Sequence, residues 1–234
     1  MKIIVTAGPT REFIDPVRFL SNPSTGKMGF AVATAAARRG HDVALVAGPV
    51  ALKTPKGVRR IDVVSAREML AAVEAELAAV APDEAAAFVS TAAVADWRPA
   101  TCAAKKLKKR QMSGVLKLVR NPDVLKTVRA RLRREKKANV ALVGFAAETN
   151  DVLAEAARKC REKGLAFIVA NDVTQKGCGF GTDTNRVTFV FPDGTLKKLP
   201  MMSKARVALA LTREVERLNG LNGGRRLNGL KVGE

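Results

Sequence analysis

Short apolar runs alternate along the chain with longer Ala-rich stretches that have helical spacing. The apolar runs predict strands at residues 2–6, 42–47, 87–90, 115–119, 140–145 and 166–170. The longer stretches predict helices at residues 27–39, 66–80, 121–133, 152–163 and 204–218. Strands joined in turn by helices are typical of a parallel sheet covered on its faces. The pattern therefore predicts an α/β fold with a Rossmann-like parallel sheet flanked by helices.

Residues with strong positional preferences mark the ends of several predicted helices. Ser65 is followed three residues later by Glu68, the spacing of a capping box. Asn121 is predicted to cap the third helix, with Pro122 in its first turn. Gly40 stands where the first helix should end. These signals fix the predicted boundaries independently of the apolar pattern.

The C-terminal part of the chain predicts a hairpin, a helix and a tail. Two β-rich segments, 186–191 and 195–199, are joined through a Pro-Asp-Gly turn. After the last helix, residues 219–234 repeat a short Leu-Asn-Gly unit and carry arginines, which predicts a flexible basic tail. We therefore expect one domain over residues 1–218, followed by this tail.

The composition is that of a soluble globular protein, with 47% apolar and 27% charged residues. The three cysteines, Cys102, Cys160 and Cys178, have neither disulfide-framework nor zinc spacing. No apolar run is long enough to span a membrane, and the N-terminus has the pattern of a strand and not of a signal peptide. These features predict a cytoplasmic protein with no membrane partner.

The net charge of +19 predicts an anionic partner. Nucleic acid and phosphorylated small molecules both meet this requirement. Only 4% of the residues are aromatic and none is Tyr, which disfavours a surface on which single-stranded bases stack. A basic nucleic-acid-binding protein nevertheless stays an alternative, and its affinity would fall steeply with salt.

A long polar loop separates the first strand from the first helix, and it holds the strongest candidate chemistry. Ser24, Gly26 and Gly29 surround the expected helix N-terminus, where free N–H groups and the helix dipole favour phosphate. Met28 stands where a Walker A motif requires Ser or Thr, and the glycine spacing of a dinucleotide fingerprint is missing. An NAD(P)-binding oxidoreductase is therefore the weaker alternative.

Several blocks of sequence, in order along the chain, carry a specific resemblance. They comprise residues 7–12, 21–22, 26–29, 92–97, 106–109, 121–123, 144–149, 170–173, 179–180 and 185–187. Taken together, these blocks resemble the phosphopantothenoylcysteine synthetase family over nearly everything up to about residue 215. Any one block would be weak evidence, whereas the ordered set is very specific.

The resemblance implies a ligase that joins 4'-phosphopantothenate to L-cysteine with CTP, a step of coenzyme A biosynthesis. The implied reaction passes through an acyl-cytidylate and yields phosphopantothenoylcysteine, CMP and pyrophosphate; ATP in place of CTP is the open alternative. Mg²⁺ is expected on the nucleotide phosphates. Many bacterial relatives carry a flavin-dependent domain ahead of this one, and because Met1 begins directly at the synthetase strand, no flavin is expected. The resemblance also implies a homodimer, with the hairpin in the 172–200 region as part of the contact.

The resemblance further implies which residues bind the substrates. Lys106 is the expected catalytic lysine, on a flap from Thr101 to Arg110. Asn22 is expected to hold the acyl carbonyl, Arg18 the phosphate of phosphopantothenate, and Ala93 the same intermediate through its backbone. The simple structural alternatives are a turn residue for Asn22, surface positions for Arg18 and Lys106, and core packing for Ala93.

The nucleotide is expected to lie among residues from several parts of the chain. Apart from Lys106 they are Ser24, Gly26, Gly29, Asp96, Pro122, Asp123, Val124, Leu125, Phe145, Lys159 and Lys163. The last two are four residues apart on a predicted helix, so both can face one ligand. Their structural alternative is a pair of solvated lysines beside Glu155 and Glu162.

Overall fold

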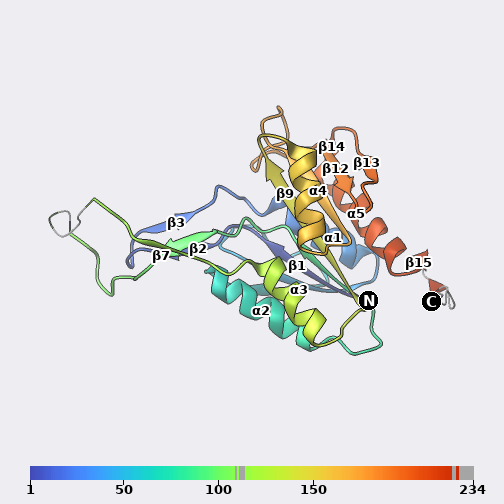
Figure 1. Ribbon diagram of the computed structural model, residues 1–234, viewed down its shortest axis with the longest axis horizontal. Helices are drawn as coiled ribbons and strands as arrows, with labels where there is room; N and C mark the ends of the chain where they lie inside the picture. The colour runs from blue at the N-terminus through green and yellow to red at the C-terminus, as the bar shows by residue number, and fades with distance from the viewer. Residues whose placement is uncertain (109, 111–113, 223–224, 227–234) are drawn as a thin grey trace.

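A computed structural model describes residues 1–108, 110, 114–222 and 225–226. Its centre is an eight-stranded sheet (Figure 1). From one edge to the other the strands are β13 (Leu196–Lys198), β12 (Val187–Val190), β10 (Phe167–Asp172), β9 (Val140–Glu148), β6 (Ala86–Ser90), β1 (Lys2–Ala7), β4 (Asp42–Ala47) and β5 (Val58–Asp62). The strands from β10 to β5 are parallel, and β12 and β13 add an antiparallel edge. The predicted Rossmann-like architecture is confirmed.

Helices cover both faces of the sheet because each presents one apolar side to it. On one face lie α1 (Lys27–Arg38) and α5 (Lys204–Leu218), which pack on the side chains of alternate strand residues such as Ile3 and Val5. On the other face lie α2 (Ala66–Ala78), α3 (Val124–Arg134) and α4 (Val152–Glu162). Two core layers therefore hold the sheet rigid, and its strand ends provide a fixed base for loops.

Four short strands form an arm that projects from the main body (Figure 1). They pair as β2 (Arg11–Phe13) with β3 (Phe19–Ser21), and as β7 (Trp97–Pro99) with β8 (Leu118–Arg120). β2 lies against β7, so the loop after β1 and the loop after β6 leave the sheet together. The segment between β7 and β8 contains the predicted flap.

The remaining short strands lie toward the C-terminal part of the chain. β11 (Thr184–Asn185) pairs with β14 (Met202–Ser203), and β15 (Leu221–Asn222) pairs with β16 (Arg225–Arg226). The last pair belongs to the predicted tail, of which residues 223–224 and 227–234 fall outside the described part of the chain. The domain boundary at residue 218 stays a prediction.

Several local predictions are confirmed. The Ser65 hydroxyl accepts a hydrogen bond from the Glu68 amide, and the Glu68 carboxylate accepts one from the Val64 amide. All three cysteines are free. None of the helices in the described ranges is both long and apolar enough to cross a membrane.

Other local predictions are wrong. Asp123, and not Asn121, caps α3, because its carboxylate accepts from the Lys126 amide at 3.0 Å. Asn121 donates instead to the Ala95 carbonyl at 2.8 Å. The strand expected at 115–119 begins only at Leu118 and belongs to the arm. The predicted hairpin, in contrast, forms as β12 and β13 and extends the central sheet at its antiparallel edge, while its use in a dimer contact stays a prediction.

Candidate functional site

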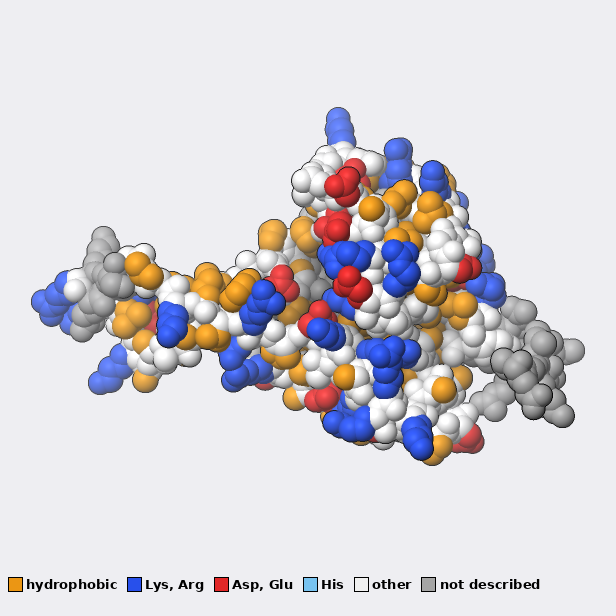
Figure 2. All heavy atoms as spheres, in the orientation of Figure 1, with side chains coloured by type: hydrophobic (Ala, Val, Ile, Leu, Met, Phe, Trp, Pro, Cys, Tyr) orange, Lys and Arg blue, Asp and Glu red, His pale blue; other side chains and the backbone are white. Residues whose placement is uncertain are grey.

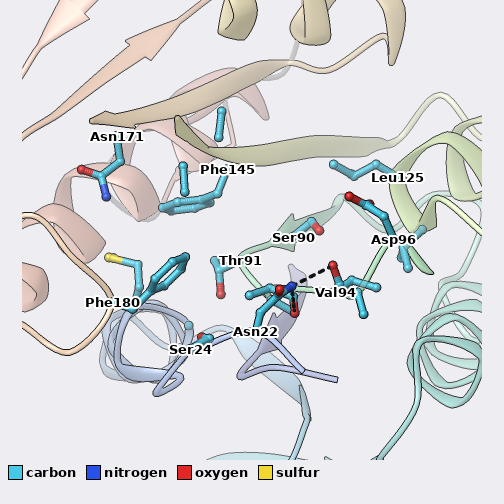
Figure 3. A pocket seen from close by; sticks show the side chains of 18 of the residues that line it. Asn22, Ser24, Ser90, Thr91, Val94, Asp96, Leu125, Phe145, Asn171 and Phe180 are labelled. Carbon is cyan, nitrogen blue, oxygen red and sulfur yellow. Dashed lines mark hydrogen bonds between the residues drawn. The ribbon is translucent and has the colours of Figure 1, made fainter. Parts of the chain in front are cut away.

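A cavity of about 720 Å³ opens at the carboxyl ends of β6, β9 and β10 (Figure 3). In an open α/β sheet this edge is where ligands bind. The cavity brings together every predicted site residue except Arg18 and Lys106: Asn22, Ser24, Gly26, Gly29, Ala93, Asp96, Pro122, Asp123, Val124, Leu125, Phe145, Lys159 and Lys163. The sequence therefore located most of the cavity, although its parts are far apart in the chain.

Asn22 joins the loop after β1 to the loop after β6. Its side-chain amide donates to the carbonyls of Ala93 and Val94 at 3.1 and 3.2 Å, as the dashed lines in Figure 3 indicate. The Ala93 amide in turn donates to the Gly8 carbonyl at 2.9 Å. Both protons of the Asn22 amide are thus used, and the backbone at Ala93 is held in place from two sides.

The N-terminus of α1 forms one wall of the cavity. Gly26 precedes the helix with φ of 77°, a left-handed conformation that suits glycine. Its amide donates to the Ser24 hydroxyl at 3.3 Å. The first N–H groups of α1 have no carbonyl partner within the helix, so this end of the cavity favours an anion.

Gly29 lets α1 approach the ends of β1 and β6. A Cβ atom there would lie 2.4 Å from the Thr91 hydroxyl, 2.5 Å from the Ala7 Cβ and 2.9 Å from the Thr6 carbonyl oxygen. Gly29 is therefore required for close packing at this wall, and its role in nucleotide binding stays a prediction.

We expect Gly29→Ala to lower the free energy of unfolding by about 1–3 kcal/mol, because the added methyl group must displace backbone. Urea denaturation measures this. Gly181→Ala is the matched control, since a Cβ at Gly181 meets no atom within 4 Å. Equal losses in the two variants would show that close packing at Gly29 is not the cause.

The opposite end of the cavity carries two lysines from the end of α4, each paired with an acid. Lys159 forms an ion pair with Glu148, and Lys163 lies 2.7 Å from the Asp123 carboxylate. Burial alone would raise the pKa of Asp123, but hydrogen bonds from Lys163 and from the Lys126 amide outweigh burial and lower it. Both predicted lysines thus line the cavity, and the paired acids partly neutralise their positive charge.

The segment 179–183 closes the side of the cavity near α1. The Thr25 hydroxyl donates to the Phe180 carbonyl at 2.9 Å, and Lys27 bonds the Asp183 carboxylate at 2.7 Å. The buried Lys204 ammonium donates to three carbonyls of this segment, those of Gly179, Phe180 and Thr182, at 2.6–3.2 Å. Burial lowers the pKa of Lys204.

Phe180 and Phe145 both face the cavity in Figure 3, on the side away from Leu125 and Asp96. The sequence predicted a role for Phe145 but none for Phe180, nor for Glu148 or Lys204. The glycines beside Phe180 were the available signal, since they allow the turn that folds this segment back over the cavity.

Arg18 and Lys106 are not among the residues that line the cavity; both lie on the arm. The Arg18 guanidinium bonds the Asp15 carboxylate and donates to the Leu107 carbonyl at 3.0 Å. The Lys106 side chain is exposed. The structure therefore places these two residues near each other and apart from the rest of the predicted site.

Within the described ranges, three or more His, Cys, Asp or Glu side chains nowhere gather closely enough to hold a metal ion. Glu148 and Asp123, two acids of the cavity, are engaged with lysines. Among the described residues these acids therefore form no protein cage of the kind that holds a divalent cation by itself.

The chain is similar in sequence to curated proteins over most of its length. The chain is 47% identical over 220 residues to the "Coenzyme A biosynthesis bifunctional protein CoaBC" of Vibrio vulnificus, covering 93% of this chain and 52% of that protein. It is 46% identical over 224 residues to the CoaBC of Bacillus subtilis, covering 95% of this chain and 53% of that protein. The chain thus spans about half the length of these curated relatives.

Solved structures show the same fold. The crystal structure of a C-terminal domain of CoaBC matches with a TM-score of 0.75 and 40% identity, over 93% of this chain and 94% of that one. A Cab2 variant in complex with phosphopantothenate-cysteine matches with a TM-score of 0.69, over 93% of this chain and 88% of that one. At 14% identity the latter likeness supports the fold alone.

The family model described as "DNA/pantothenate metabolism flavoprotein C-terminal domain" matches residues 1–218. This range contains the whole central sheet, the arm and the cavity. The chain therefore belongs to the family of DNA/pantothenate metabolism flavoprotein C-terminal domains.

Proposed function

We propose that the chain is a phosphopantothenate–cysteine ligase that uses CTP. The carboxylate of 4'-phosphopantothenate attacks the α-phosphate of CTP, pyrophosphate leaves, and an acyl-cytidylate forms. The amine of L-cysteine then attacks the acyl carbonyl, and CMP leaves with one former carboxylate oxygen. The observation that carries this proposal is the cavity, which gathers every predicted nucleotide residue except Lys106 at the strand ends of a family member.

The first step must bring a carboxylate to a polyphosphate, and positive charge offsets the repulsion. The N-termini of α1 and α3 both open into the cavity, and their dipoles favour anions. Lys159 and Lys163 add positive charge at the α3 end. Glu148 and Asp123 hold the two lysine side chains in position before the nucleotide binds. Phosphate oxygens of the nucleotide would then compete with these acids for the lysines.

The second step requires the acyl carbonyl to be held for attack by the amine. Asn22 has no spare amide proton, because both go to Ala93 and Val94. We therefore expect one of these two bonds to be exchanged for a bond to the acyl oxygen. The backbone at Ala93, fixed by Gly8, keeps the intermediate in place beside it.

Mg²⁺ is expected to arrive with the nucleotide, since in the described part of the chain no three acidic, His or Cys side chains gather to hold it alone. When bound, it supplies charge neutralisation at the phosphates. The protein residues that could contact this ion are the acids that line the cavity. They are Asp96, which lines it, and Asp123 and Glu148, which are paired with Lys163 and Lys159. No flavin has a part in this reaction.

A homodimer explains why two predicted residues lie away from the cavity. The arm exposes large apolar side chains, including Val17 at 56%, Trp97 at 45% and Val115 at 82% exposure, and Figure 2 shows apolar side chains along its surface. Exposed apolar surface of this kind marks a contact. The arm, more than the predicted hairpin, is thus the expected contact, and it would carry Arg18 and Lys106 to the cavity of the second copy.

The proposal is tested by measuring pyrophosphate release with phosphopantothenate and either CTP or ATP, with and without cysteine. We expect release with CTP, and amide product only when cysteine is present. Much faster release with ATP would overturn the choice of nucleotide. Release with neither nucleotide would overturn the ligase itself and reopen the oxidoreductase and nucleic-acid-binding alternatives. A cytoplasmic location stays a prediction.

A further inference from the structure

Asp15 is a buried carboxylate in the turn between β2 and β3, away from the cavity. It accepts hydrogen bonds from the backbone amides of Val17 and Arg18, both at 2.9 Å, and from the Arg18 guanidinium at 3.0 Å. It also accepts from the Leu107 amide at 3.1 Å, across 92 residues of chain. One carboxylate thus organises its own turn and reaches the flap.

The peptide groups of Leu107 are held from both sides. Its amide donates to Asp15, and its carbonyl accepts from Arg18 at 3.0 Å. A second bond, from the Ala103 amide to the Ile14 carbonyl at 3.0 Å, ties the flap to the same turn. Leu107 follows Lys106 directly, so these bonds fix the backbone from which Lys106 extends.

The Asp15 side chain is shielded from water, whereas Arg18 stays partly exposed. The Arg18 guanidinium holds the pKa of Asp15 well below its usual range, against the opposing effect of burial. The carboxylate therefore stays ionised at neutral pH. If Asp15 lost its charge, the Leu107 amide and the Arg18 guanidinium would donate to a weaker acceptor.

We propose that Asp15 is a positioning residue that fixes Arg18 and the flap beside Lys106 as one unit, so that substrate binding at Arg18 and placement of Lys106 depend on each other. The roles of Arg18 and Lys106 rest on the proposed function. The unit itself rests on the hydrogen bonds of Asp15 and Leu107. Asp15 is not expected to touch the substrate itself, so its effect passes through Arg18 and Leu107.

The test is Asp15→Asn, which preserves shape and removes the charge. We expect hydrogen exchange at the Leu107 amide to accelerate, and kcat/KM for phosphopantothenate to fall about 10- to 100-fold, the range for a lost charge-assisted hydrogen bond. In a Lys106→Gln background the same change should cost less than about twofold, because residues acting as a unit are non-additive. Glu12→Gln is the matched control: Glu12 is a buried acid of the same arm that accepts from the Ala66 amide at 2.9 Å.

The outcomes separate the two proposals. Unchanged Leu107 exchange, losses that multiply with Lys106→Gln, or kinetics identical to those of Glu12→Gln would overturn the positioning role. If the unaltered protein releases no pyrophosphate with any nucleotide, the proposed function fails, while Leu107 exchange still decides whether the unit exists. If Asp15→Asn does not fold, Asp15→Glu, which keeps the charge, is measured instead. We expect hydrogen exchange at the Leu107 amide to be slower in Asp15→Glu than in Arg18→Gln. Equal exchange in those two variants would contradict the proposal.

Discussion

Asn22→Asp is expected to leave pyrophosphate release within about tenfold of the unaltered protein and to slow conversion of the acyl-cytidylate to the amide by about 100-fold or more, the cost of losing a preorganised donor. The substitution is isosteric, so its effect is electrostatic. A carboxylate would face the carbonyl oxygens of Ala93 and Val94, which now accept from the amide at 3.1 and 3.2 Å. Rapid-quench analysis with and without cysteine separates the two steps.

Asn139→Asp is the matched control for this prediction. The Asn139 amide also donates to two backbone carbonyls, those of Ala81 at 3.1 Å and Glu84 at 2.6 Å, and it lies outside the cavity. We expect this variant to lose stability and keep both catalytic steps. If Asn22→Asp slowed pyrophosphate release as much as amide formation, Asn22 would act in the first step and the assignment would be wrong.

Lys106→Gln is expected to slow pyrophosphate release by about 100-fold or more, because a cation that meets developing negative charge is lost. Lys105→Gln is the matched control on the same exposed segment. An exposed charge that only contributes to the general field has a small effect, so we expect less than about threefold for Lys105→Gln. Similar losses in both variants would indicate a diffuse electrostatic effect and no specific role for Lys106.

Mixing the Asn22→Asp and Lys106→Gln chains tests whether the arm serves a second copy. In a hybrid dimer, the Lys106→Gln chain keeps Asn22 in its cavity, and the arm of the Asn22→Asp chain supplies Lys106 to that cavity. One complete site is thereby restored. We therefore expect the mixture to regain activity that neither variant has alone. Failure to regain activity, with hybrid dimers demonstrated by mass spectrometry, would place Lys106 and Asn22 in the same chain.

Most of the fold could be predicted because every strand of the central sheet except β5, and every helix that covers the sheet, carries its own pattern. The strand at Lys2–Ala7 is buried throughout, and the helix that Ser65 caps has its capping box. β5 was missed because Val58–Asp62 is an edge strand rich in charge, with little apolar pattern. Of the arm, only the strand near β8 and the flap were predicted, because the arm's strands are three residues long and depend on pairing for their structure.

The site was predictable where residues lie near the end of a strand, as Phe145 does in β9, or cap the start of a helix, as Gly26 and Asp123 do. Three features depend on tertiary structure and could not be predicted. These are the wall built by Lys204 around the Phe180 segment, the pairing of Lys159 with Glu148, and the distance of Lys106 from the cavity. The prediction that Asn121 caps α3 was wrong because Asp123, two residues later, also has a side chain suited to capping. The Asn121 amide donates instead to the Ala95 carbonyl.

The transfer of one carboxylate oxygen to the nucleotide decides whether the carboxylate is activated as an acyl-cytidylate. Phosphopantothenate labelled with heavy oxygen in its carboxylate is converted with CTP and cysteine, and the CMP and pyrophosphate are analysed by mass spectrometry. If the cavity activates the carboxylate as an acyl-cytidylate, one labelled oxygen appears in CMP and none in pyrophosphate. Label in orthophosphate with formation of CDP, or unlabelled CMP alongside the amide product, would contradict the account.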